Sequence, residues 1–183
     1  MTIREILTYD KHEATLRKKS ESVPAVNRRV KKLIQDLRET LAARTDGGGL
    51  AAPQIGVHSR VALAQLGQQN EDPTASKSLI VLVNPEIVDA GDDQLDFDGC
   101  LSFPGLYGET VRPHRLRVKG LDEFGKSFDR VFEGFDAVVV HHEIDHLDGV
   151  LFIDRVNSLD DLYRLRENQQ GELVRVPLSA SVR

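Results

Sequence analysis

The sequence predicts an α+β fold with a mostly antiparallel sheet. Apolar residues at steps of three and four favour a helix over residues 26–43, and a continuous apolar run favours a second helix over residues 134–148. Short β-branched or alternating runs, separated by turn residues, occupy much of the chain between them. Strands joined by turns, together with two principal helices, are typical of this class.

Composition narrows the class of protein. A chain of 183 residues is most simply one domain, and 40% hydrophobic with 29% charged residues is an ordinary balance for a globular protein. The net charge of −5 argues against a general nucleic-acid binder. Cys100 is the single cysteine, so no intrachain disulfide can form. The start of the chain lacks the apolar core of a signal peptide, and no apolar run could span a membrane, so we expect a cytoplasmic protein.

The first third of the chain should contain one extended arm and one helix. Residues 1–22 are mixed and polar, which predicts the arm. The glycines of residues 46–49 should end the helix that follows. Residues 49–56 are small or apolar except for Gln54, so they form either a buried turn or a place where backbone approaches a ligand closely. The apolar stripe of the helix consists of Val26, Val30, Leu33, Ile34, Leu37 and Leu41.

The middle of the chain reads as strands and turns. Asn84 and Pro85 should end one strand, which residues 86–89 could restart. Residues 91–94 and 123–125 look like turns, the second joining a hairpin, and residues 67–78 look like a loop. The predicted strands are residues 60–66, 79–83, 115–119 and 127–132.

The helix over residues 134–148 should be buried and should end at Gly149. Its three consecutive valines are poor helix formers, so tertiary packing must override local propensity. Residues 151–153 should pack on the core, and residues 158–161 could cap a short helix through about residue 166. We expect residues 167–183 to form a short strand or a mobile tail of a single domain that covers residues 1–183.

A His-Glu-x-x-His motif lies within this second helix. His142 and His146 are four residues apart, so both imidazoles can face one metal ion, and Glu143 lies beside them as a candidate general base for water. A surface helix can carry two histidines without function. Here the preceding residues 135–140 are mainly apolar and imply burial, where unpaired imidazoles and a carboxylate would be costly. The motif therefore favours a metal site.

A catalytic ion of this kind usually has three protein ligands and one open position. One familiar arrangement places a third histidine where this chain has Phe152, which cannot ligate. A second arrangement uses a later glutamate, and Glu167 and Glu172 occur in polar, weakly patterned surroundings. The remaining candidate is Cys100, because a thiolate beside two imidazoles makes a sound site. Its alternative role is that of a small buried hydrophobe.

Three segments together resemble the peptide deformylase family. Residues 47–54 read Gly-Gly-Gly-Leu-Ala-Ala-Pro-Gln and look like the family's Gly-x-Gly-Leu-Ala-Ala-x-Gln. Residues 98–102 read Asp-Gly-Cys-Leu-Ser, similar to Glu-Gly-Cys-Leu-Ser, and residues 142–146 match the third motif. The motifs occur in the family's order, and the resemblance spans roughly residues 3–157. It implies the same α+β fold, with the metal-binding helix packed centrally in the concavity of the sheet.

The resemblance implies a metal-dependent hydrolase that removes the formyl group from the N-formylmethionine of new polypeptides. Its metal would be Fe²⁺ in the cell, often replaced by Zn²⁺, Ni²⁺ or Co²⁺ in preparations. The expected partners are N-formylmethionyl peptides and the ribosome near the nascent-chain exit, with neither a membrane nor specific nucleic-acid recognition. By motif position, the metal ligands would be Cys100, His142 and His146.

The resemblance also assigns roles around the metal. Glu143 would be the general base, and the Gln54 side chain and the Leu101 backbone N–H would form an oxyanion hole. Val138 and Val139 lie one turn before His142, where they either line an apolar pocket for the methionine side chain or only fill the core. The backbone at Gly49 would hydrogen-bond to the substrate peptide.

The chain departs from the family pattern at three places. Asp98 stands where the family has Glu, and His141 stands where it has Gln. The family's Val-x-Arg corresponds to residues 111–113, Val-Arg-Pro, which shifts the arginine by one residue. The family's Glu and Arg would pair, so these departures bear on catalytic efficiency and substrate range. The side chain of His141 points about 100° away from its neighbour on the helix, which favours a structural role over ligation.

Two alternatives to a working deformylase remain open from the sequence. The first is a divergent paralogue that acts on another N-formyl compound, or a metallopeptidase. The second is a deformylase-like binding protein with weak or no turnover. The presence of Gln54, Cys100, His142, Glu143 and His146 argues against the second.

Overall fold

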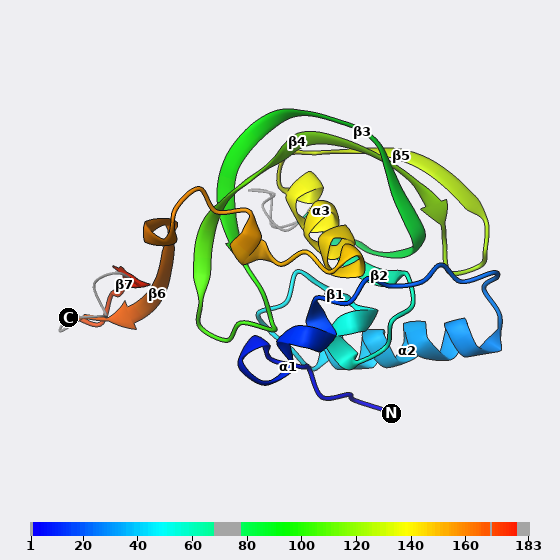
Figure 1. Cartoon of the computed structure of the whole chain (residues 1–183), viewed down its shortest axis with the longest axis horizontal. Coiled ribbons are helices and arrows are strands. Elements are labelled where there is room, and N and C mark those ends of the chain that lie inside the picture. The colour runs from blue at the N-terminus through cyan, green and yellow to red at the C-terminus, as the bar shows by residue number, and fades with distance from the viewer. Residues whose placement is uncertain (1, 68–77, 169, 179–183) are drawn as a thin grey trace.

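In the computed structural model of the chain, a curved antiparallel sheet wraps around one central helix (Figure 1). The structure describes residues 2–67, 78–168 and 170–178. The central helix is α3 (Gly134–Asp148), and the strands that arch over it are β3 (Ser78–Gly99), β4 (Tyr107–Leu121) and β5 (Ser127–Glu133). The predicted α+β class with a mostly antiparallel sheet is confirmed.

The sheet continues on both sides of this arch. Its order is β1-β2-β3-β4-β6-β7, with β5 paired to β4, and all of these pairings are antiparallel. The remaining strands are β1 (Gly49–Ala51), β2 (Val61–Leu66), β6 (Leu162–Glu167) and β7 (Leu173–Pro177). The turn-linked hairpin of β4 and β5 is confirmed, whereas most of the predicted loop at residues 67–78 lies outside the described residues.

Helix α2 (Arg28–Ala42) packs its apolar stripe against β1 and β2. The side chain of Asn27 accepts hydrogen bonds from the backbone N–H groups of Arg29 and Val30, which satisfies two of the free donors at the helix start. The helix ends at Ala42, ahead of the glycines that were expected to end it. The predicted helix is therefore confirmed with slightly shorter bounds.

Helix α3 has the bounds that the sequence predicts. Every residue from 137 to 147 is buried, so packing on all sides compensates for the poor helix propensity of the valines. Gly149 ends the helix in the left-handed conformation with φ +75°. A Cβ at Gly149 would lie 2.2 Å from the carbonyl oxygen of Arg17, so the close approach of the N-terminal segment also requires glycine.

The prediction of an extended arm over residues 1–22 is wrong in part, because α1 (Tyr9–Leu16) forms there. Leu16 is its only buried residue, so the helix has no apolar stripe that a sequence pattern could reveal. The segment is fixed by tertiary contacts, in which the Leu7 N–H donates to the Gln54 carbonyl and the Tyr9 N–H donates to the Ser102 carbonyl. The N-terminal segment thus supports two loops of the candidate site.

Two predicted interruptions of β3 are also wrong. The strand continues through Asn84 and Pro85, where register shifts and a positive φ of 49° at Asn84 absorb the irregularity. Val83 pairs with both β2 and β4, so this point is where β3 passes from one partner strand to the other. Residues 91–94, predicted as a turn, remain in the strand because they pair with β4.

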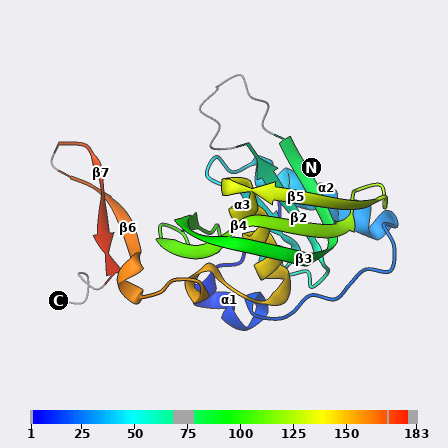
Figure 2. The ribbon, with the colours of Figure 1, turned by 90° about the horizontal axis from the view of Figure 1, so that it is seen from above.

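The C-terminal segment forms strands in place of the predicted helix. Ser158 caps only the short 3₁₀ helix η3 (Leu159–Asp161), and the β6–β7 hairpin then projects from the body (Figure 2). Of the two expectations for residues 167–183, the strand forms as β7, and residues 179–183 lie outside the described part. Residues 151 and 152 are buried, as expected.

Two further 3₁₀ helices are η1 (Ala52–Ile55) and η2 (Phe152–Asp154). In the described part of the chain, no helix is long and apolar enough to cross a membrane.

Candidate active site and metal centre

Three candidate metal ligands meet between the end of β3 and the buried helix α3. Cys100 is the first residue after β3, and His142 and His146 lie one turn apart on α3. Their ligand atoms all lie within 4.8 Å of one another, and the Cys100 Sγ is 3.2 Å from the His146 Nε2. Burial raises the pKa of the Cys100 thiol, but the charge of His146 and hydrogen bonds from both histidines lower it overall to about 5. A thiolate is the form that binds a metal.

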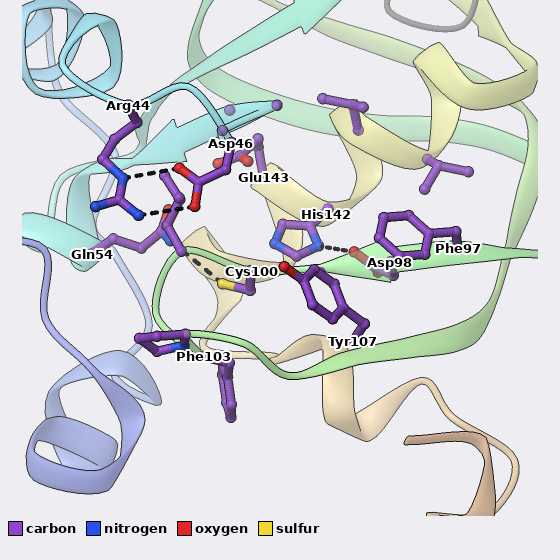
Figure 3. A pocket seen from close by; sticks show the side chains of 18 of the residues that line it. Arg44, Asp46, Gln54, Phe97, Asp98, Cys100, Phe103, Tyr107, His142 and Glu143 are labelled. Carbon is purple, nitrogen blue, oxygen red and sulfur yellow. Dashed lines mark hydrogen bonds and ion pairs between the residues drawn. The ribbon is translucent and has the colours of Figure 1, made fainter. Parts of the chain in front are cut away.

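The imidazole of His142 is oriented by Asp98 (Figure 3). The His142 Nδ1 lies 2.8 Å from the Asp98 Oδ1, and a carboxylate only accepts, so the Nδ1 carries the hydrogen. When the imidazole is neutral, its Nε2 therefore carries the lone pair that a metal ion would bind. Carboxylate partners of this kind commonly fix the tautomer of a metal-binding histidine.

Asp98 is itself held by Arg112 in the interior of the protein. The Arg112 Nε donates to the Asp98 Oδ2 at 2.8 Å, and the Thr110 hydroxyl donates to the same oxygen at 3.1 Å. Burial acts to raise the pKa of Asp98, but the charges of His142 and Arg112 lower it well below its usual range. Asp98 therefore remains an anion, and the acid–arginine pair forms despite the shorter acid and the altered motif.

His141 lies outside the ligand cluster, as its place on the helix predicts. Its Nδ1 is 2.9 Å from the Arg112 Nη1, and because arginine only donates, the Nδ1 is the acceptor. Burial, reinforced by the Arg112 charge and opposed by that of Asp145, lowers the pKa of His141 to about 4. His141 is thus a neutral side chain that helps to hold Arg112.

Glu143 is buried beside the cluster, and its Oε2 has no hydrogen-bond partner among the described residues. Burial raises the pKa of its carboxyl group to about 7. A buried carboxylate with a free oxygen and a pKa near neutrality suits a general base. Gly49 approaches it so closely that a Cβ there would lie 2.3 Å from the Glu143 Oε1.

The amide of Gln54 is oriented by its surroundings. Its Oε1 accepts a hydrogen bond of 2.8 Å from the Ala51 N–H, which a flipped amide could not do. The Nε2 therefore points toward the cluster, 3.5 Å from the Cys100 Sγ and 3.2 Å from the Ser102 hydroxyl. The Leu101 backbone N–H makes no hydrogen bond within the described part of the chain. The Leu101 N–H is thus a free donor, and the Gln54 amide is a donor that is directed toward the cluster.

A pocket with a cavity volume of about 200 Å³ opens onto these groups. Gln54 of η1, Cys100 after β3, and His142 and Glu143 of α3 face it (Figure 3). Phe97 and Tyr107, whose ring centroids are 5.5 Å apart, form one wall that the sequence did not indicate. The other predicted site residues on its lining are Gly49, Leu101, Val138 and Val139. His146 does not line the pocket and is 1% exposed.

A family model described as polypeptide deformylase matches residues 3–161 of this chain. The chain belongs to the polypeptide deformylase family. A peptide deformylase of Acetivibrio thermocellus is 41% identical over 163 residues, which cover 87% of this chain and 90% of that protein. The crystal structure of peptide deformylase from Ehrlichia chaffeensis in complex with actinonin is 34% identical, with a TM-score of 0.77, over 86% of this chain and 91% of that chain. A Met-Ala-Ser-bound class I type b peptide deformylase from Acinetobacter baumannii is 31% identical, with a TM-score of 0.75, over 85% and 100%.

Peptide deformylases are metal-dependent hydrolases that remove the N-formyl group from nascent polypeptides, and this activity accounts for the contents of the pocket. One thiolate and two imidazoles form a donor set that suits a divalent transition-metal ion with a fourth position open. Glu143, whose Oε2 has no partner among the described residues, lines the same pocket as Cys100 and His142. The residues of this deformylase therefore fit a single catalytic metal ion.

Local sequence patterns did not reveal that three charged residues, Arg112, Asp145 and Arg155, support the deformylase site. Arg112 is fully buried and contacts Asp98, while its Nη1 lies 2.8 Å from the Asp145 Oδ2. Asp145 also accepts hydrogen bonds of 3.1 and 2.7 Å from Arg155. The signal for Asp145 was present, because a carboxylate within a buried helix needs a cation. The identity of that cation depends on how β4 and η2 pack, which no local pattern reveals.

Proposed function

We propose that Cys100, His142 and His146 hold one divalent ion in this chain and that the pocket beside them binds N-formylmethionyl peptides for deformylation. The observation that carries the proposal is a single pocket lined by Cys100 and His142 of the ligand cluster, by Glu143, whose Oε2 has no partner among the described residues, and by the oriented Gln54 amide. We propose Fe²⁺ as the ion in the cell, with Zn²⁺, Ni²⁺ or Co²⁺ as substitutes in preparations, as the family resemblance implies.

The reaction divides the work between the ion and three groups of the protein. When bound, the ion supplies Lewis-acid chemistry that lowers the pKa of water and polarises the formyl carbonyl. Glu143 takes a proton from the water that attacks the formyl carbon and delivers a proton to the amine as the carbon–nitrogen bond breaks. The Gln54 Nε2 and the Leu101 N–H donate hydrogen bonds to the oxyanion that develops. The products are formate and a free α-amine.

The shape of the pocket supports methionine as the first residue of the substrate. Val138 and Val139 line its apolar part, where a flexible thioether side chain can fill an irregular space. Gly49 lies in β1, the end strand of the described sheet, so backbone groups of its outer edge can pair with an extended peptide. The Acinetobacter baumannii structure that binds Met-Ala-Ser supports a substrate of this kind.

We propose further that residues 1–183 act as one catalytic domain in the cytoplasm, on chains that emerge from the ribosome. The central place of α3, which contacts β1 through β5, supports a single domain. Co-sedimentation of the protein with ribosomes, with and without nascent chains, tests the ribosomal partner.

The primary test is a deformylation assay with defined metals. The protein is purified without oxygen, its metal content is measured, and formyl-Met-Ala-Ser is compared with unformylated Met-Ala-Ser. We expect release of formate from the first peptide only. Absence of formate release with Fe²⁺, Ni²⁺ or Zn²⁺ bound would refute the proposal, and cleavage of a peptide bond would favour a metallopeptidase.

The assignment of Glu143 has its own test. Glu143→Ala should retain the metal, because the carboxylate is not a ligand, and should lower kcat by about 10²–10⁴-fold, the usual contribution of a general base. Metal content and kcat are measured on the same sample. Retention of full activity would show that another group is the base.

A further inference from the structure

A chain of buried ion pairs connects one metal ligand to the surface of the protein. His142 donates to Asp98, Arg112 bridges Asp98 and Asp145, and Arg155 binds both oxygens of Asp145. The Arg112 side chain is completely buried and that of Asp145 is 7% exposed, whereas the Arg155 side chain is 36% exposed. Arg155 is therefore the outermost member of a chain whose innermost member faces the proposed ion.

The geometry shows how Arg155 controls the position of Arg112. Arg112 directs its Nε to Asp98 and its Nη1 to Asp145, so two carboxylates compete for one guanidinium. Arg155 supplies a second guanidinium to Asp145 through contacts of 2.7 and 3.1 Å. Two anions are then balanced by two cations, and Arg112 can remain close to Asp98. Without Arg155, Asp145 would be left with Arg112 as its only strong cation and would draw it away from Asp98.

We propose that Arg155 is a positioning residue for the metal site, which acts through Asp145, Arg112 and Asp98 to hold His142 in its metal-binding orientation. The inference rests on the metal site proposed above. Arg155 itself touches neither the pocket nor the ligand cluster. Its place is set by the backbone, because the Arg155 carbonyl accepts a hydrogen bond from the Val111 N–H of β4. A side-chain substitution therefore leaves this anchor in place.

A second ion pair on α3 supplies a matched control. Arg60 lies 2.6 Å from Asp148 at the end of the same helix, and its side chain is 13% exposed. Asp148 contacts Lys19 as well as Arg60, whereas Asp98 and Asp145 pair with Arg112 and Arg155. Arg60→Gln thus removes a guanidinium that contacts the end of α3, and it leaves the ion pairs that lead to His142 in place.

The test measures Co²⁺ affinity by competition with a chromophoric chelator, together with the visible spectrum of the bound ion. We expect Arg155→Gln to weaken Co²⁺ binding about tenfold, at the lower end of the effect of outer-sphere partners, and to alter the spectrum. Arg155→Lys should have an intermediate effect, because one ammonium cannot replace two directed donors. Arg60→Gln should change the affinity by less than about twofold. Melting temperatures of the metal-free proteins show that each variant is folded.

A double variant tests the competition itself. In Asp145→Asn/Arg155→Gln the neutral amide no longer draws Arg112 from Asp98, so Co²⁺ affinity should recover to within about threefold of wild type. The proposal is overturned if Arg155→Gln binds Co²⁺ as the wild type does, if Arg60→Gln weakens binding equally, or if the double variant is no better than Arg155→Gln. A wild-type protein that binds no Co²⁺ would instead refute the metal site.

Discussion

Gly49→Ala should impair catalysis without removing the metal. A Cβ at this position would lie 2.3 Å from the Glu143 Oε1 and 2.7 Å from the carbonyl oxygen of Leu63. The carboxylate of Glu143 would have to recede by about 1 Å to reach ordinary contact near 3.4 Å. Displacement of a catalytic group by about 1 Å costs on the order of 10²-fold in rate, or roughly 2.7 kcal/mol in the activation free energy.

The matched control for this prediction is Gly91→Ala. Gly91 also lies in a strand, but a Cβ there meets nothing within 4 Å. Alanine at such a position should leave kcat unchanged and should stabilise the strand slightly, because glycine is the more flexible residue in the unfolded chain.

The assay compares kcat for formyl-Met-Ala-Ser in the two variants and the wild type, with metal content measured on each sample. We expect Gly49→Ala to contain a full complement of metal and to turn over about 100-fold more slowly. A kcat of Gly49→Ala within about threefold of the wild-type value would show that the strand or the carboxylate can shift without loss of rate. The argument from close approach would then be wrong.

Three further predictions concern other parts of the molecule. Gln54→Ala should lower kcat by ~10²–10³-fold, with the exposed Gln35→Ala as control, and a loss below about tenfold would exclude an oxyanion role. Gly149→Ala, with φ +75° and a Cβ 2.2 Å from the Arg17 carbonyl oxygen, should lower the free energy of unfolding by more than about 1 kcal/mol in denaturant titrations. A denaturation midpoint equal to that of the wild type would contradict this prediction. Chelation should abolish deformylation and added Fe²⁺ or Co²⁺ should restore it, whereas activity that persists in the metal-free protein would argue against a metal-dependent reaction.

Local pattern predicted the elements that carry their own signal. α2 has an apolar stripe, α3 has a long apolar run that ends at a glycine, and the β4–β5 hairpin has a turn between two strand-like runs. α1 has one buried residue, so nothing in its sequence distinguishes it from an extended arm. The continuity of β3 through Pro85 was missed because it depends on two partner strands that lie far away in the sequence.

The candidate site also combines residues that a local pattern predicts with residues that only tertiary contacts identify. The pitch of a helix places His142 and His146 on one face, and Glu143 lies next to His142 on the same helix. Cys100 could be named only as the remaining candidate and through the resemblance, since its approach to α3 is a tertiary contact. Phe97 and Tyr107 were missed as walls of the pocket because adjacent strands bring them together.

The sequence by itself determined the helix that carries His142 and His146 and the α+β class, because these depend on residue types at short spacings. Tertiary structure alone decided which groups support them. Asp98 reaches His142, Arg112 joins Asp98 to Asp145, and Arg155 completes the set from a segment after the helix. Buried charges must find partners wherever the fold brings them, so their pairing follows from packing between distant segments and has no local signature.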